Sequence, residues 1–137
     1  MPTIHGVVET SLYVADLERS ARFYEDMLGF SRMVGDERFR ALSVAGRQVL
    51  LLFKRGASLK PGTVPGGIIP PHDGSGELHL AFAIELADFE PWRRRLSDKG
   101  ITIESTVCWE RGGQSLYFRD PDQHLVELIT PGCWPIY

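Results

Sequence analysis

Cysteine is scarce in this sequence, which holds only Cys108 and Cys133 among 137 residues. Two cysteines without a Cys-x-x-Cys spacing cannot form a structural zinc site by themselves, and we expect both to be structural. No apolar run approaches the roughly 20 residues that cross a bilayer, and the N-terminus lacks a basic segment followed by an apolar stretch. These absences predict a cytoplasmic protein that has no membrane partner.

An excess of charge of one sign is also lacking. The formal net charge is -3, with 15 Lys and Arg residues against 18 Asp and Glu residues. This balance offers no attraction for a polyanion, and the basic run at residues 93–95 is typical of the solvated face of a helix. We therefore expect no nucleic-acid partner. The hydrophobic fraction of 43% indicates one folded domain over residues 1–137.

The first half of the chain, residues 5–54, has the pattern of a strand, a helix and three further strands. Asp16 stands at an N-cap position, and Gly29 follows the last apolar residue of the helical pattern. The expected helix therefore covers residues 16–28. The strands are expected at residues 7–14, 30–34, 39–44 and 48–54.

The second half, residues 77–131, repeats this order. Asp88 can cap a second helix, and Gly100 is placed to end it. The strands of this half are expected at residues 78–84, 101–109, 114–119 and 125–129. Such a repeat predicts an α+β fold made of two tandem βαβββ modules.

The segment that joins the two modules, residues 55–76, is rich in glycine and proline. A connector of this length inside one domain is usually functional or mobile. We expect that it could close over a pocket.

Strand alternation places three candidate metal ligands on one concave face. If the apolar side chains of each opening strand face the helix, Glu9 and His79 project to the opposite face. In the last strand Val126 and Leu128 suit the helix side, so Glu127 shares the face of Glu9 and His79. Two carboxylates and an imidazole predict a site for one divalent ion, with Mn, Fe, Co, Ni or Mg favoured and Zn not excluded. Three protein ligands leave coordination positions open for water and a chelating substrate.

Each ligand also has a structural alternative. Glu9 can be a carboxylate on the wet face of an edge strand, and His79 can be a hydrogen-bonded histidine of the sheet. Glu127 is harder to explain in this way, because an ionised carboxylate among apolar neighbours is costly unless it is paired or bound to a cation.

Further polar residues share this face by strand parity and are candidates for substrate binding. Tyr117 can instead be packing, and Arg119 can form an ion pair with a nearby acid. Trp109 and Trp134 are expected to form part of the pocket wall or of the core. The candidate substrate-binding residues are Ser11, Tyr13, Tyr117 and Arg119 on strands, together with Arg111 in a turn that could rim the pocket.

Three motifs resemble the vicinal-oxygen-chelate superfamily, which is the glyoxalase, bleomycin-resistance and extradiol dioxygenase type. The opening motif comprises residues 12–17 (Leu-Tyr-Val-Ala-Asp-Leu), Ser20, residues 23–24 (Phe-Tyr) and residues 28–30 (Leu-Gly-Phe). The other two are residues 79–82 (His-Leu-Ala-Phe), and residues 117–122 (Tyr-Phe-Arg-Asp-Pro-Asp) running into residues 125–128 (Leu-Val-Glu-Leu). The resemblance implies sheets that curl into a cup around a metal or ligand pocket, metal ligands at Glu9, His79 and Glu127, and a homodimer.

The sequence departs from several members of that superfamily at Glu9. Extradiol dioxygenases and fosfomycin-modifying transferases have histidine there, and glyoxalase I has glutamine or histidine. Glyoxalase I also uses a glutamate in the last strand of its first module, where this chain has the apolar residues 49–53. A two-histidine, one-carboxylate iron triad is therefore not available from these positions. These departures argue against extradiol dioxygenase activity and against glyoxalase I activity. His5 would need an altered strand register to reach the same ion.

The leading hypothesis is a metal-dependent enzyme acting on a small oxygenated substrate that chelates the ion. The reaction types, in falling order of preference, are isomerisation, lyase chemistry and ring-opening oxidation. Glu9 or Glu127 would exchange between the roles of metal ligand and proton acceptor. The alternative is a metal-free protein that sequesters a drug or metabolite, as bleomycin-resistance proteins do.

Overall fold

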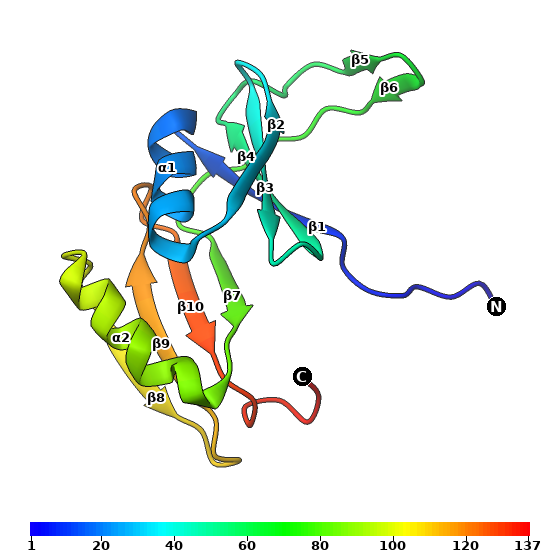
Figure 1. Ribbon diagram of the computed structural model, residues 1–137. Helices are drawn as coiled ribbons and strands as arrows, with labels where there is room; N and C mark the ends of the chain where they lie inside the picture. The colour runs from blue at the N-terminus through cyan, green and yellow to red at the C-terminus, as the bar shows by residue number, and fades with distance from the viewer. The chain divides into compact units, whose positions relative to one another are not determined.

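Two four-stranded sheets, one in each half of the chain, form the framework of the protein (Figure 1). The computed structural model describes residues 1–137, which divide into two units, Met1–Ser75 and Gly76–Tyr137. Each unit contains one four-stranded sheet and one α-helix. The predicted α+β fold with two βαβββ modules is confirmed.

The first unit begins with the predicted strand-helix pair. Asp16 caps the helix, accepting a hydrogen bond from the backbone N–H of Arg19 at 3.0 Å, and Gly29 ends it in the left-handed conformation with φ 74°. The strand β1 pairs in parallel with the last strand of the module, and the remaining pairs are antiparallel, giving the order β1-β4-β3-β2. The elements are β1 (Glu9–Val14), α1 (Leu17–Leu28), β2 (Ser31–Gly35), β3 (Phe39–Val44) and β4 (Gln48–Lys54).

The second unit has the same topology, with strand order β7-β10-β9-β8 and a parallel pair between β7 and β10. Its helix follows a short 3-10 turn, η1 (Leu86–Asp88). Asp88 occupies the predicted N-cap position but makes no side-chain capping bond, because the backbone is already helical there. The elements are β7 (His79–Ala83), α2 (Phe89–Asp98), β8 (Ser105–Cys108), β9 (Gln114–Arg119) and β10 (Leu125–Ile129).

The connector carries a hairpin that the sequence pattern did not predict. Strands β5 (Gly62–Val64) and β6 (Gly67–Ile69) pair across a short turn. Hydrogen bonds within the connector join its two ends at the base of the hairpin. One runs from the backbone N–H of His72 to the carbonyl of Ser58 at 3.0 Å, and another from the N–H of Gly56 to the Asp73 carboxylate at 3.0 Å. The hairpin lies within the first unit, Met1–Ser75.

The helix-facing side chains of both sheets form the cores, as the alternation predicts. In the first unit Leu12, Leu50 and Leu52 are at most 2% exposed, and α1 packs on this side through Tyr24. The opposite face carries side chains that are only partly covered. In the second unit the corresponding apolar strand residues, which are at most 1% exposed, are Leu116, Phe118, Val126 and Leu128. One face of each sheet is thus left for the polar residues that the sequence singles out.

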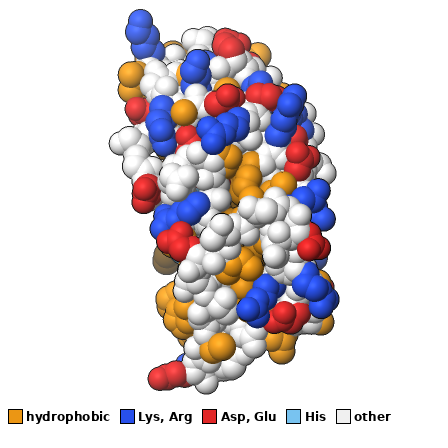
Figure 2. Space-filling view, turned by 90° about the vertical axis from the view of Figure 1, so that its left-hand side faces the viewer, with side chains coloured by type: hydrophobic (Ala, Val, Ile, Leu, Met, Phe, Trp, Pro, Cys, Tyr) orange, Lys and Arg blue, Asp and Glu red, His pale blue; other side chains and the backbone are white.

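The molecular surface carries a mixture of charges. Figure 2 shows basic and acidic side chains interspersed over one face, with apolar side chains between them. None of the helices has the length and apolar character that a membrane-spanning segment requires.

Candidate metal and substrate site

Glu127 is a buried carboxylate in the middle of the second sheet. It lies on β10, between β7 and β9, and only 5% of the residue is exposed. Two hydroxyl groups of β9 donate to its Oε1 atom, Ser115 at 2.6 Å and Tyr117 at 2.9 Å. Tyr117 is the direct cross-strand partner of Glu127, and Ser115 lies two residues away on the same face. The strand pairing therefore fixes the orientation of this carboxylate.

A third side chain supports this arrangement from the turn between β8 and β9. The indole N–H of Trp109 donates to the Ser115 hydroxyl at 2.8 Å. Ser115 uses its own proton to reach Glu127, so the three groups form a directed chain of hydrogen bonds. Trp109, which was expected to be wall or core, also has a polar role in holding the carboxylate.

His79 meets Glu127 from the adjacent parallel strand. Its Nδ1 atom lies 2.9 Å from the backbone carbonyl oxygen of Leu125, and its Nε2 atom lies 3.3 Å from Glu127 Oε2. A carbonyl oxygen can only accept a hydrogen bond, so Nδ1 carries a proton. In the neutral imidazole the lone pair is then on Nε2 and faces the carboxylate.

This geometry suits a bound cation. A lone pair and a carboxylate oxygen repel each other at hydrogen-bond distance unless a proton or a metal ion lies between them. Two ligand atoms that each lie about 2.1 Å from one ion, at an angle of roughly 90 to 110°, are separated by about 3.0 to 3.4 Å. The observed 3.3 Å falls in that interval. Metal-binding histidines also commonly donate their second ring N–H to a backbone carbonyl.

Glu9 belongs to the other unit. It opens β1, is exposed, and lines a pocket of the first unit. No group of three or more His, Cys, Asp and Glu side chains gathers in the structure in a way that could hold a metal ion. The structure thus brings together two of the three predicted ligands, His79 and Glu127, and the participation of Glu9 stays a prediction.

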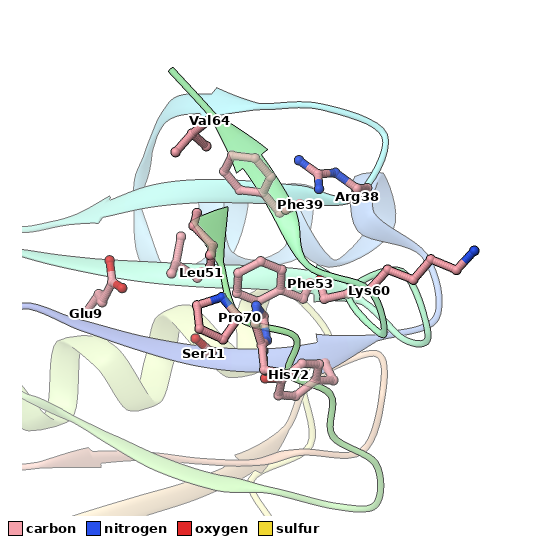
Figure 3. A pocket seen from close by; sticks show the side chains of 14 residues that line it. Glu9, Ser11, Arg38, Phe39, Leu51, Phe53, Lys60, Val64, Pro70 and His72 are labelled. Carbon is pink, nitrogen blue, oxygen red and sulfur yellow. Dashed lines mark hydrogen bonds between the residues drawn. The ribbon is translucent and has the colours of Figure 1, made fainter. Parts of the chain in front are cut away.

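The pocket of the first unit has a volume of about 500 Å³ and lies between the sheet and the β5–β6 hairpin (Figure 3). Glu9, Ser11 and Tyr13 reach it from alternate positions of β1, and Leu51 and Phe53 reach it from β4. These are the side chains on the sheet face opposite α1. Two of the predicted substrate-binding residues, Ser11 and Tyr13, are therefore pocket residues.

A contact between β1 and the connector closes one side of this pocket. The Tyr13 hydroxyl lies 2.8 Å from His72 Nδ1, and the His72 ring meets the Phe53 ring edge-on with centroids 4.5 Å apart. A Cβ atom at Gly74 would overlap the Tyr13 ring, so only glycine lets the connector pass this closely. Burial raises the pKa of the Tyr13 hydroxyl, and the negative charge of Asp73 raises it further.

The sequence pattern missed His72 as a pocket residue. A histidine within a glycine- and proline-rich segment is a signal that the connector is more than a spacer. Its partner Tyr13 is 59 positions away, however, so no local pattern could pair the two residues.

The two predicted arginines differ in their surroundings. Arg119 forms a two-pronged ion pair with Glu104, with Nε at 2.8 Å and Nη2 at 3.0 Å from the carboxylate oxygens. Its Nη1 donates to the carbonyl of Gln123 at 3.1 Å. This is the structural alternative that the sequence left open. Arg111 is exposed in the turn between β8 and β9. A substrate contact by either residue stays a prediction.

Replacing Tyr117 with phenylalanine tests the support of the carboxylate. Burial is the main cause that raises the pKa of Tyr117 above its ordinary value of 10.0, and the hydrogen bond to Glu127 adds to it. The folded state therefore holds this proton more tightly than the unfolded state. The resulting stabilisation is complete below about pH 10 and is lost as the pH rises through the raised pKa.

At pH 7 we expect Tyr117→Phe to lower the free energy of unfolding by about 1.5 kcal/mol, the cost of one hydrogen bond to a charged group. Urea denaturation at pH 7 and above pH 10 measures both effects. The variant should lose less stability than the wild type over that pH interval. Equal losses would show that the Tyr117 proton does not contribute.

Comparison with known proteins agrees with this fold and these motifs. The family model of the Glyoxalase/Bleomycin resistance protein/Dioxygenase superfamily matches residues 6–128. The chain therefore belongs to this superfamily, as its motifs indicate.

Several relatives have named activities. A glutathione transferase FosA from Serratia marcescens is 31% identical over 86% of this chain and 75% of its own length. A metallothiol transferase FosB from Staphylococcus saprophyticus is 28% identical over 93% of this chain and 78% of its own length. Among solved structures, a lactoylglutathione lyase from Agrobacterium tumefaciens is 28% identical, has a TM-score of 0.89, and covers 98% of this chain and 100% of its own.

Proposed function

We propose that the protein is a divalent-metal-dependent enzyme that acts on a small oxygenated substrate chelated to the ion. The observation that carries this proposal is the pair formed by His79 and Glu127, in which His79 Nε2 lies 3.3 Å from an oxygen of the buried carboxylate. The proposed ligands are His79 and Glu127 of the second unit together with Glu9 of the first. The ion is one of Mn, Fe, Co, Ni, Zn or Mg. We further propose a cytoplasmic homodimer.

The residues around the proposed ligands have separate tasks. Ser115 and Tyr117 hold the Oε1 atom of Glu127, which leaves Oε2 directed toward His79. The Leu125 carbonyl holds His79 in the tautomer that presents Nε2. Held by these residues, a divalent ion would supply Lewis acidity to the substrate oxygens.

Proton transfer is better assigned to Glu9 than to Glu127. Both carboxylates are candidates, since either can exchange between ligand and proton acceptor. Glu127 is buried and restrained by two donors on Oε1, whereas Glu9 is exposed at the pocket and has more freedom to move. Ser11 and Tyr13 of the same strand are placed to orient a substrate in that pocket.

Activity assays of the metal-loaded protein would identify the reaction class. Isomerase and lyase chemistry both develop negative charge on a substrate oxygen, and a bound divalent ion would favour either reaction. The names of the relatives add transfer of a thiol to the reactions to be measured. We propose assays of the metal-loaded protein with α-keto aldehydes and glutathione, with an epoxide and a thiol, and with catechols.

Metal binding by the chelator-stripped protein tests the proposal. We expect Mn, Ni, Co, Fe, Zn or Mg to bind with about 1:1 stoichiometry in calorimetry and to raise the melting temperature, because a ligand that binds the folded state stabilises it. His79→Gln should lower the metal affinity at least about tenfold, since a ligand or its support typically contributes a factor of 10 to 100.

His5→Gln is the matched control, because His5 is an exposed histidine outside every strand and helix. It should bind metal like the wild type. If the wild type neither retains nor binds any of these ions, the enzyme proposal is wrong and a metal-free sequestering protein takes its place. If His5→Gln is impaired and His79→Gln is not, the ligand assignment is wrong.

A further inference from the structure

The pocket of the first unit has two ends of opposite charge and an apolar middle. Figure 3 shows Glu9 at one end and Arg38 and Lys60 toward the other, with Leu51, Phe53 and Pro70 between them. From this arrangement we propose that the pocket binds an amphipathic anion, namely an aromatic or branched aliphatic body that ends in a carboxylate. This inference rests on the proposed function, for which it names the substrate class.

The apolar middle of the pocket is built from two sources. The sheet contributes Leu51 and Phe53, and the hairpin contributes Val64 and Ile69, which are 41% and 50% exposed. A ligand that covers these exposed apolar side chains removes their surface from water, which favours binding. A ligand with a flat or branched hydrocarbon body would be held between hairpin and sheet.

Two polar side chains on the connector side of the pocket, Tyr13 and His72, already satisfy each other. The Tyr13 hydroxyl and His72 Nδ1 share a hydrogen bond of 2.8 Å, and the His72 ring lies edge-on against Phe53. A polar ligand body would have to compete with this bond. An apolar body leaves it intact, so this side of the pocket favours hydrocarbon.

The basic end supplies the recognition of an anion. Arg38 is anchored by an ion pair with Asp36 at 3.1 Å, while its side chain remains 45% exposed and lines the pocket. The long Lys60 side chain reaches outward at the rim (Figure 3). Exposed ion pairs contribute little individually, so the carboxylate sets the orientation of the ligand and the apolar body supplies most of the affinity.

The opposite end carries Glu9, which repels a second anionic group. A ligand oriented by Arg38 therefore directs its uncharged end toward Glu9, the proposed proton acceptor. The volume of about 500 Å³ lies within the range of pockets that enclose drug-sized ligands, roughly 300 to 1,000 Å³. A two- or three-carbon anion would leave most of this space unfilled.

Binding of 2-naphthoate, measured by calorimetry in buffer that contains EDTA, tests the inference. We expect 2-naphthoate to bind at least about tenfold more tightly than acetate or methylphosphonate, which lack the apolar body. It should bind a few-fold more tightly than 2-naphthalenemethanol, which lacks the charge, and this margin should shrink at high salt.

Neighbouring hairpin residues provide a matched pair of variants. Ile69 lines the pocket, whereas Ile68 is 70% exposed on the other face of the same strand. Ile69→Gln should weaken 2-naphthoate binding about tenfold, and Ile68→Gln should leave it unchanged. The double variant Arg38→Gln/Lys60→Gln should remove the preference for the acid over the alcohol. The charge-matched double variant Arg47→Gln/Lys54→Gln, at exposed positions outside the pocket, should retain it.

The inference is wrong if 2-naphthoate does not bind, if the alcohol binds as tightly as the acid, or if the two isoleucine variants behave alike. The EDTA keeps this test separate from the metal titration. If the protein binds metal but not 2-naphthoate, the proposed function stands and the proposed substrate class is wrong. If the protein binds 2-naphthoate but no metal, the proposed ligand class of the pocket stands and the proposed metal-dependent enzyme is wrong.

Discussion

Replacing Glu127 with glutamine is expected to reduce the affinity for divalent metal at least about 100-fold, because the variant loses a charged ligand atom. The glutamine carbonyl oxygen can still accept the hydrogen bonds that Ser115 and Tyr117 donate to Oε1. Without metal, the free energy of unfolding of the variant should therefore lie within about 1 kcal/mol of that of the wild type. Calorimetric metal titration and urea denaturation in EDTA measure the two quantities.

Glu110→Gln is the control for this variant, because Glu110 is an exposed carboxylate in the turn between β8 and β9. It should leave both metal affinity and stability unchanged. A Glu127→Gln protein that is much less stable without metal, and yet binds metal normally, would assign Glu127 a structural role. The proposed metal site would then lose its central ligand.

Replacing Phe118 with alanine is expected to destabilise the second unit by about 3 to 5 kcal/mol. Phe118 is completely buried in β9, opposite Val126 of β10, and the lost side chain would leave a cavity in the middle of the core. The cost combines the lost burial of the ring with the cavity that remains. Urea denaturation followed by circular dichroism measures this change.

Two further variants keep this prediction testable if Phe118→Ala does not fold. Phe118→Leu retains part of the volume and should show a smaller loss. Val34→Ala, at a position that is 61% exposed on β2, should change stability by no more than about 0.5 kcal/mol. If Phe118→Ala were as stable as Val34→Ala, the core of the second sheet would have been assigned incorrectly.

The regular elements could be predicted because their signals are local. The cap at Asp16 and the left-handed glycine at Gly29 mark the ends of α1 within one residue. The limits of β3, β4, β9 and β10 coincide with the predicted ranges. The predicted strand at residues 101–109 is shorter, since only Ser105–Cys108 pairs with β9. Edge pairing depends on the neighbouring strand, so the residue pattern of β8 alone does not define its ends.

The hairpin in the connector was missed for a related reason. Its two strands have three residues each, which is too short for alternation to be recognised among glycine and proline residues. Hydrogen bonds to Gly56 and His72 hold the base of the hairpin. These are tertiary contacts, and the composition of residues 55–76 records only that the segment is a connector.

The sequence by itself determined the faces of the strands. Because side chains alternate with a period of two, Glu9, His79 and Glu127 had to lie opposite the apolar positions that pack on the helices. The tertiary structure decided which polar groups meet. Strand register set the 3.3 Å contact of His79 with Glu127, and the folded-back connector set the bond of Tyr13 to His72. These partners are 48 and 59 positions apart, and only the pairing of strands and loops in space brings such distant residues within bonding distance.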